Sequence, residues 1–418
     1  MNIEPLPLAA TAALNTRIVF VIELARRLHQ FGTAAPRLED AVSSAAQRLG
    51  MRAEVWSSPT AIILSFADQA QGDDSVAQVT QVIRLAPGDV NLARLCEADA
   101  IADGVIGGRI GIEEGARQLR ALPKPLDRFT RRSMVLGYGL SAGTFAVLIN
   151  AAWPDVFMAG LIGLVIGAIV LLAGSRPRMA PATEAGSAMV ATLIASLTSA
   201  WVVPLNVNLV VLASMIVLVP GMMLTTAVRE LSAQHLASGV SRLFGALASL
   251  LKLIFGVVAV VQILGWFGVA TPSVQAPAVP AWVQWPTLPV AGAGFAMVFL
   301  AARRDWVLVA LSAMTGYVVA TLIGHTFGPA FGVFAGGLVL AAASNVYARI
   351  THRPGALVRE PGIILLVPGS VGFRTFSYLA ENNLGTGTHT AILLVTLLVA
   401  LVAGLLFGDL LVAPRRSL

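Results

Sequence analysis

The chain has 418 residues, of which 56% are hydrophobic and only 12% are charged, and its mean hydropathy is +0.80. A soluble domain carries about 25% charged residues, so this composition excludes a purely soluble globular protein. The formal net charge of +6 does not indicate nucleic-acid binding, because the excess Lys and Arg residues lie in short loops between apolar runs and form no basic face.

The first 132 residues are typical of a soluble domain, because they hold 15 acidic and 15 basic residues. Their hydrophobic pattern predicts two helices, three short strands and two more helices, an order that favours a small α+β domain. The expected elements are 17–31, 36–49, 53–56, 60–66, 79–85, 91–107 and 112–122. The first residues of the chain include Glu4 and no early Lys or Arg. This is not typical of a signal peptide, so we expect this domain to lie in the cytosol.

Residues 1–132 contain no nucleotide-binding loop, no HExxH sequence and no paired Cys/His spacing. We therefore expect no enzyme activity, no cofactor and no metal, and a secondary transporter is favoured over an ATP-driven pump. The pairs Glu39-Asp40 and Glu113-Glu114 are interpreted as solvated helix faces, and Cys96 as a buried core residue.

Residues 133–418 hold 13 basic and 7 acidic residues, too few to solvate a soluble surface of that size. Ten apolar runs have a length close to the roughly 20 residues that cross a bilayer. They fall at 134–152, 156–173, 186–203, 207–227, 243–266, 288–302, 306–322, 327–348, 362–381 and 390–412. The predicted fold is thus a polytopic α-helical membrane protein with about ten transmembrane helices behind the α+β domain.

The charge of the loops provides an independent test of this count. Alternate loops carry arginines, whereas the loops between them carry neither Lys nor Arg. The arginine-bearing loops and tail contain Arg176, Arg178, Arg229, Arg242, Arg303, Arg304, Arg349, Arg353, Arg359, Arg415 and Arg416. This alternation follows the positive-inside rule if both termini are cytosolic, and it indicates a multi-pass protein of the inner (plasma) membrane in contact with the lipid bilayer.

An internal repeat divides the membrane part. Leu-Val-Pro-Gly occurs with Pro220 and Gly221, and again 148 residues later with Pro368 and Gly369. Each pair lies in the fourth helix of a five-helix unit, and an odd number of helices gives two units of opposite orientation, an inverted 5+5 repeat. We expect the domains 1–132, 133–270 and 271–418. Two helix breaks in equivalent positions favour a central binding site over two packing kinks.

Polar residues follow each break. The substrate-binding candidates are Thr225, Thr226, Arg229, Ser370 and Arg374. Hydroxyl groups and freed backbone groups bind a small polar solute, and an arginine can hold a carboxylate by two parallel hydrogen bonds. Lys252 is a candidate for coupling or substrate binding, with a structural pairing to a neighbouring acid as the alternative. No membrane-embedded acid stands out as a proton carrier.

These residues resemble the threonine/serine exporter (ThrE) family, in its fused two-half form. The resemblance rests on Leu28-His29-Gln30-Phe31-Gly32, Arg37-Leu38-Glu39-Asp40, Asn91-Leu92-Ala93-Arg94-Leu95, Val219-Pro220-Gly221 and Leu366-Val367-Pro368-Gly369-Ser370-Val371-Gly372-Phe373-Arg374. It implies export of small hydroxy amino acids driven by the proton gradient. The chain departs from the family pattern after the first Pro-Gly, at Thr226 and Glu230, and at His235.

Three interpretations follow. The first is a secondary exporter of threonine or serine, with protons as the coupling partner that the resemblance implies. The second is a dicarboxylate exporter, in which Lys252 or Arg229 supplies a second cation. The third is a non-transporting membrane sensor or scaffold, and the sequence leaves a homo-oligomer open in each case.

Overall fold

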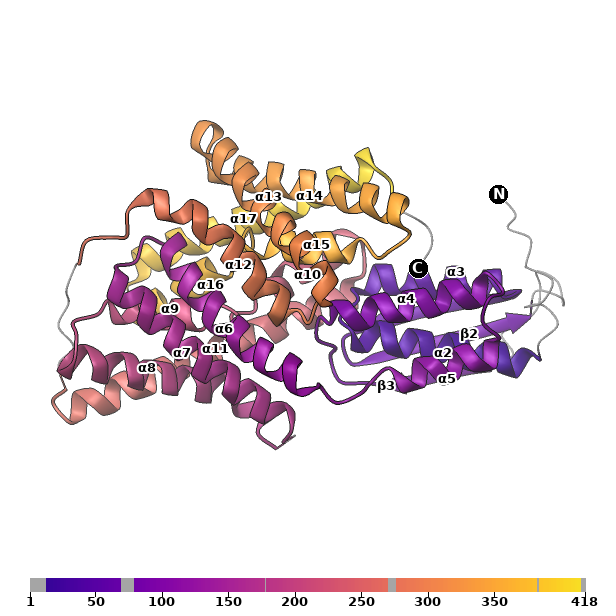
Figure 1. Cartoon of the computed structure of the whole chain (residues 1–418), viewed down its shortest axis with the longest axis horizontal. Coiled ribbons are helices and arrows are strands. Elements are labelled where there is room, and N and C mark those ends of the chain that lie inside the picture. The colour runs from indigo at the N-terminus through magenta and orange to yellow at the C-terminus, as the bar shows by residue number, and fades with distance from the viewer. Residues whose placement is uncertain (1–12, 69–78, 177, 270–275, 382, 415–418) are drawn as a thin grey trace.

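The computed structural model describes residues 13–68, 79–176, 178–269, 276–381 and 383–414. The first seven elements form an N-terminal domain beside a bundle of helices (Figure 1). The seven elements are α2 (Leu14–Gln30), α3 (Ala35–Arg48), β1 (Met51–Ser58), β2 (Ala61–Asp68), β3 (Val79–Arg84), α4 (Leu92–Ile106) and α5 (Ile112–Ala121). The predicted ααβββαα order is confirmed, and the expected boundaries lie close to these.

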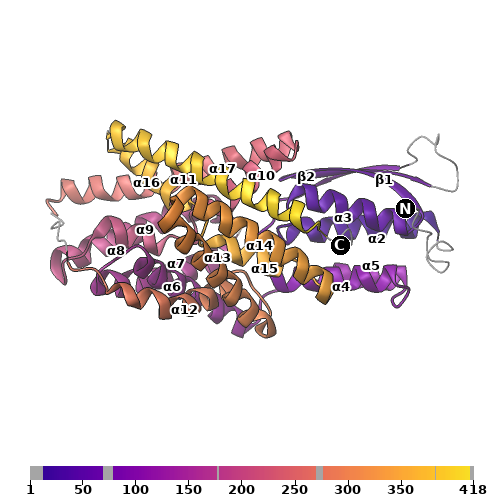
Figure 2. The same ribbon diagram turned by 90° about the horizontal axis from the view of Figure 1, so that it is seen from above.

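The N-terminal domain has three layers. The strands form an antiparallel sheet in the order β1-β2-β3, which pairs Met51 with Asp68 and Ala61 with Arg84. Helices α2 and α3 cover one face of the sheet, and α4 and α5 form a third layer beyond them (Figure 2). The short amphipathic helices fold because packing buries their apolar faces, and side chains such as Phe20 and Leu38 become fully inaccessible to solvent.

The bundle contains helices that match the ten apolar runs of the sequence. They are α6 (Arg128–Leu148), α7 (Trp153–Gly174), α8 (Thr183–Trp201), α9 (Val207–Ser214), α10 (Gly221–Ser232), α11 (Leu236–Trp266), α12 (Gln284–Val298), α13 (Trp306–Phe327), α14 (Pro329–Thr351), α15 (Ala356–Ile364), α16 (Gly369–Ala380) and α17 (Leu384–Leu411). Two of the runs, 207–227 and 362–381, are each split into two shorter helices, as the Pro-Gly pairs predict.

Within the described residues, six helical segments are long and apolar enough to cross a membrane. They are Trp153–Gly174, Leu236–Trp266, Arg303–Phe327, Pro329–Thr351, Ala356–Ala380 and Leu384–Leu411. The other four runs correspond to α6, which begins with charged residues, to α8, to the short α12 and to the split pair α9 and α10. The fold is therefore a polytopic helical membrane protein.

One end of the helical bundle faces the N-terminal domain, and we call it the proximal end. The opposite end of the bundle is called the distal end. Helices α10 and α15 lie on the proximal side, and α9 and α16 lie on the distal side (Figures 1 and 2). The chain therefore runs from distal to proximal through α9 and α10, and from proximal to distal through α15 and α16.

The same packing contact occurs twice, at positions 148 residues apart. A Cβ atom on Gly239 would lie 2.7 Å from Leu231 Cγ, and a Cβ atom on Gly387 would lie 2.7 Å from Leu379 Cδ2. Each glycine lets the first turn of a long helix, α11 or α17, contact the preceding half-helix closely. The equivalent residues paired by the sequence thus make equivalent contacts.

Candidate functional site

The two helix breaks have the same local geometry. Pro220 precedes α10 with φ −77° and ψ 44°, and Pro368 precedes α16 with φ −79° and ψ 37°. Proline has no N–H and cannot continue the ladder of the preceding helix, so α9 ends at Ser214 and α15 ends at Ile364. The chain restarts in each case at the glycine that follows the proline.

The breaks meet in the interior of the bundle. A Cβ atom on Gly221 would lie 2.4 Å from Val367 Cγ1 and 3.1 Å from the Cα atom of Gly369. A Cβ atom on Gly369 would lie 3.0 Å from both Val219 Cγ1 and the Cα atom of Gly221. The contact is reciprocal, because each glycine touches the other and the valine that precedes the other's proline. Only glycine allows the two backbones to approach this closely.

Each break leaves backbone groups without partners. Within the described residues, the carbonyl groups of Val217 and Leu218 accept no hydrogen bond, and the N–H groups of Met222 and Met223 donate none. The carbonyl groups of residues 365–366 and the N–H groups of residues 370–371 repeat this pattern in the second break, again among the residues described. Helix N-termini carry partial positive charge and C-termini partial negative charge, so partial charges of both signs meet at the crossing.

A polar cavity of about 340 Å³ lies distal to the crossing, between α9, α11 and α16. Arg374 lines it together with Glu381, and the remaining polar lining residues are Asn206, Asn208, Ser377 and Tyr378. The Arg374 side chain is exposed and makes no hydrogen bond or ion pair with any described residue. Arg374 is one of the predicted substrate-binding residues, whereas Asn206 and Asn208 are not among them.

The other predicted site residues are spread over different places. Thr225 is buried, and its hydroxyl group has no partner among the described residues. Thr226 and Ser370 are half-buried close to the crossing and do not line the distal cavity. Arg229 lies on the proximal side of α10, where it lines a second cavity.

Lys252 pairs with an acid of a neighbouring helix. Its Nζ atom forms an ion pair with Glu184 of α8, and the hydroxyl group of Ser249 donates a hydrogen bond of 2.6 Å to the same carboxylate. This is the structural alternative that the sequence left open. The pair joins α8 to α11 and lies outside the lining of both cavities.

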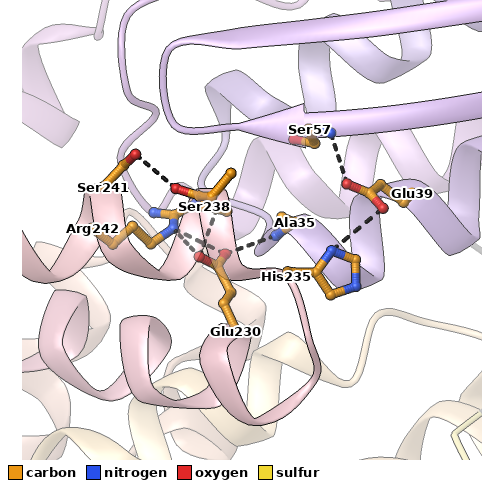
Figure 3. Close-up of polar contacts among 9 residues, drawn as sticks. Ala35, Glu39, Ser57, Glu230, His235, Ser238, Ser241 and Arg242 are labelled. Carbon is orange, nitrogen blue, oxygen red and sulfur yellow. Dashed lines mark hydrogen bonds and ion pairs between the residues drawn. The ribbon is translucent and has the colours of Figure 1, made fainter.

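The N-terminal domain contacts α10 through Glu230, which is fully buried (Figure 3). The Glu230 carboxylate accepts hydrogen bonds from Ala35 N–H (3.0 Å), from the Ser238 hydroxyl (2.7 Å) and from Arg242 Nε (3.0 Å). Helix α3 has no side-chain cap of its own, because its N-cap residue is Ala34. Glu230 therefore caps α3 from the helical bundle, where a negative charge is favourable.

A second polar contact lies beside the first (Figure 3). Glu39 accepts a hydrogen bond of 2.7 Å from Ser57 N–H and lies 3.4 Å from His235 Nδ1. Burial raises the pKa of the Glu39 carboxyl group above its ordinary value. The interpretation of Glu39 as a solvated helix face is wrong, since this carboxylate is half-buried between α3, β1 and the start of α11.

Helix α4 forms the other attachment of the N-terminal domain. The N–H groups of Leu92 and Ala93 donate to the carbonyl groups of Phe299 and Leu300 at the end of α12. Arg353 makes two hydrogen bonds of 2.7 Å to Asp305 beside them.

Cys96 on α4 is buried, as the sequence indicates, and burial raises the pKa of its thiol to about 11. A thiol with this pKa is protonated at neutral pH, which does not suit a nucleophile. The described residues contain no group of three or more His, Cys, Asp and Glu side chains that could hold a metal ion.

Comparison with known proteins places the chain in a family. Residues 19–264 match the family model described as "Putative threonine/serine exporter", and residues 287–411 match the model described as "Threonine/Serine exporter, ThrE". No solved structure matches the chain.

Similar curated proteins come from yeasts. The chain is 23% identical to "Pheromone-regulated membrane protein 10" of Debaryomyces hansenii over 392 residues, which cover 89% of the chain and 38% of that protein. It is 24% identical to an uncharacterized protein of Schizosaccharomyces pombe. That alignment is 443 residues long and covers 97% of the chain and 57% of the other protein. The chain thus spans about two fifths of the first relative's length and less than three fifths of the second's. Both halves match in order, and the chain belongs to the threonine/serine exporter family as a fused, two-half member.

Proposed function

We propose that this protein is a secondary transporter that exports small hydroxy amino acids, threonine or serine, across the inner membrane. The observation that carries the proposal is the contact between the two Pro-Gly breaks next to a polar cavity that contains Arg374. A broken helix is tolerated at membrane depth only where the freed backbone groups meet protein or a watery cavity. Paired breaks at a repeat interface are the usual position of a transporter's substrate site.

The proposed architecture has ten crossing helices in an inverted 5+5 repeat, with units 133–270 and 271–418. The reciprocal contact of Gly221 and Gly369 supports this arrangement, because a two-fold axis between the breaks accounts for it. The glycine contacts of α11 and α17 at equivalent positions support it independently. The N-terminal domain, residues 1–132, is proposed to lie in the cytosol together with the C-terminus, since the arginine-bearing loops share its side.

The charges of the distal cavity favour an amino acid as the substrate. Arg374 can hold a carboxylate by two parallel hydrogen bonds, and Glu381 can hold an ammonium group. A dicarboxylate needs a second cation, but Arg374 is the only cationic residue among the described residues that line this cavity. Lys252 and Arg229, which the dicarboxylate interpretation assigned to that role, lie elsewhere.

Counterflow in proteoliposomes tests the proposal. Purified protein is reconstituted with internal L-threonine, and uptake of labelled threonine, serine and succinate is measured with and without a proton gradient. We expect threonine and serine counterflow in the wild type, and a loss of roughly tenfold or more in Arg374→Ala. Arg84→Ala, which removes an exposed arginine of β3, is the matched control.

Four results would contradict parts of the proposal. Normal flux in Arg374→Ala would remove the distal site, and succinate counterflow without threonine counterflow would replace the substrate class. Absence of flux for every solute in the panel would favour a sensor or scaffold. A flux that does not respond to an imposed proton gradient would exclude proton coupling.

A further inference from the structure

A second charged cavity lies on the proximal side of the crossing, where the N-terminal domain meets the helical bundle. Its charged lining residues come from four helices: Arg37 from α3, Asp99 from α4, Arg229 from α10 and Glu360 from α15. The apolar side chains around them include Leu28 and Leu92, so the charges lie in a largely apolar wall. Two of these four charges belong to the N-terminal domain.

Three of the charged side chains have no direct partner. Arg37, Arg229 and Glu360 make no side-chain hydrogen bond or ion pair with any residue that the structure describes. The two arginines lie close enough to repel one another, and burial together with Arg229 lowers the pKa of Arg37, whereas Glu360, Asp99 and Asp409 act in the opposite direction. The cavity lining thus sets two guanidinium groups against two carboxylates, a balance of charge that suits a zwitterion better than a simple anion. The guanidinium groups still have donors for a carboxylate, and Glu360 still has acceptors for an ammonium group.

This cavity lies on the opposite side of the crossing from the distal one. Arg229 lies eight residues after Gly221, and Arg374 lies five residues after Gly369. At 1.5 Å per residue these arginines are about 12 Å and about 8 Å from the crossing, on half-helices that run in opposite directions. Each half-helix thus carries one arginine from the breaks to the cavity on its own side.

The two cavities differ in size. The proximal cavity has a volume of about 40 Å³, and the distal one has about 340 Å³. On this measure one water molecule needs about 10–15 Å³, so the proximal cavity holds only a few water molecules and is much the narrower of the two. Binding of an amino acid there requires the proximal cavity to widen. Widening the proximal cavity requires α3 and α4 to separate from α10 and α15.

We propose that the proximal cavity is a second binding site for a zwitterionic amino acid, in which Arg37 and Arg229 hold the carboxylate and Glu360 holds the ammonium group. The N-terminal domain then supplies part of the solute pathway. This inference rests on the proposed function for its substrate class, but it concerns a different site and a residue, Arg37, outside the helical bundle.

Ligand-induced thermal stabilisation of the purified full-length protein tests the site. The measurement uses L-threonine as the probe in an Arg374→Ala background, so that the distal site does not contribute. We expect L-threonine to raise the unfolding midpoint of Arg374→Ala, because a ligand that binds only the folded state stabilises it. Addition of Arg37→Gln should raise the required concentration roughly tenfold or more, and Arg37→Lys should recover part of this loss.

Matched controls keep the test decisive. Arg84→Gln in the same background should leave the response unchanged, since Arg84 is exposed on β3. Each variant is compared with its own ligand-free midpoint, so a general loss of stability does not mimic a loss of binding. The proposal is overturned if Arg374→Ala shows no response to L-threonine, if Arg37→Gln responds like its parent, or if succinate stabilises the protein and L-threonine does not.

Failure of this inference can be separated from failure of the proposed function. Threonine counterflow that depends on Arg374, without an Arg37-dependent thermal response, would remove the proximal site and keep the transporter. An Arg37-dependent response in a protein without counterflow would keep the site and remove the transport activity.

Discussion

Alanine at Gly221 is the most direct test of the crossing. The added methyl group would lie 2.4 Å from Val367 Cγ1 and 3.1 Å from the Cα atom of Gly369, both well inside van der Waals contact. The valine is a β-branched side chain with few alternative rotamers, and the second neighbour is backbone. The methyl group therefore has no free space, and the two breaks must move apart to admit it.

The expected cost follows from this overpacking. Inserting a methyl group into a packed interior costs about 1–3 kcal/mol, and each 1.4 kcal/mol corresponds to a factor of ten. Threonine counterflow by Gly221→Ala should fall roughly tenfold, and the unfolding midpoint of the protein should fall with it. Gly265→Ala on α11 is the control, because a Cβ atom there has no neighbour within 4 Å.

A second substitution distinguishes the crossing from a general loss of stability. Val367→Ala removes the nearest atom and leaves the 3.1 Å contact, so the double variant with Gly221→Ala should recover much of the lost counterflow. Gly369→Ala should be rescued less by Val219→Ala, because a backbone contact of 3.0 Å to Gly221 remains. Wild-type counterflow in Gly221→Ala, or equal rescue by Val367→Ala and by an alanine at a distant valine, would refute the reasoning.

Three further predictions follow from polar side chains away from the crossing. Glu230→Ala leaves Arg242 without its buried partner and removes the cap of α3, which should cost about 3–5 kcal/mol, measurable as a lower midpoint of thermal unfolding, whereas Glu230→Asp should cost less. Lys252→Met should lower the midpoint of thermal unfolding, since it leaves Glu184 without its cation. Replacing Glu184 by Leu in the same variant should restore the midpoint without abolishing counterflow. Loss of counterflow in the stable double variant would instead assign Lys252 to transport. Burial lowers the pKa of His29 from its ordinary 6.5, so this group favours the folded state above pH 6.5 and loses that contribution as the pH falls through the lowered value; His29→Gln should flatten the decrease of the unfolding midpoint between about pH 7 and 5.

The order of elements could be read from the sequence because it depends on local periodicity. Residues 17–31 and 36–49 have helical spacing, and the structure places α2 at Leu14–Gln30 and α3 at Ala35–Arg48. The helix breaks were predictable for the same reason, since proline removes a backbone donor wherever it stands. These features depend on the local sequence and need no knowledge of tertiary contacts.

The groups that join the N-terminal domain to the bundle could not be read in this way. The sequence indicates a solvated Glu39 and singles out Glu230 only as a departure from the family pattern, because their partners His235 and Ala35 are about 200 residues away along the chain. The sequence offers one signal for this contact: Glu230, Ser238 and Arg242 are polar residues that lie within 13 positions of one another. Tertiary contact decided their burial, and a single sequence does not contain that contact.

The contacts of the N-terminal domain have consequences for movement of the half-helix α10. Helix α4 holds the domain to the end of α12 through backbone hydrogen bonds, outside the broken helices. Helix α3 holds α10 through the bond from Ala35 N–H to Glu230. If the proximal cavity widens as proposed, a shift of α10 away from α3 would break this bond and expose a helix N-terminus, at a cost of about 1.5–3 kcal/mol for a hydrogen bond to a charged group. Under that proposal the domain would do more than cover the proximal surface, because its attachment to α12 would hold α3 in place while α10 and Glu230 move.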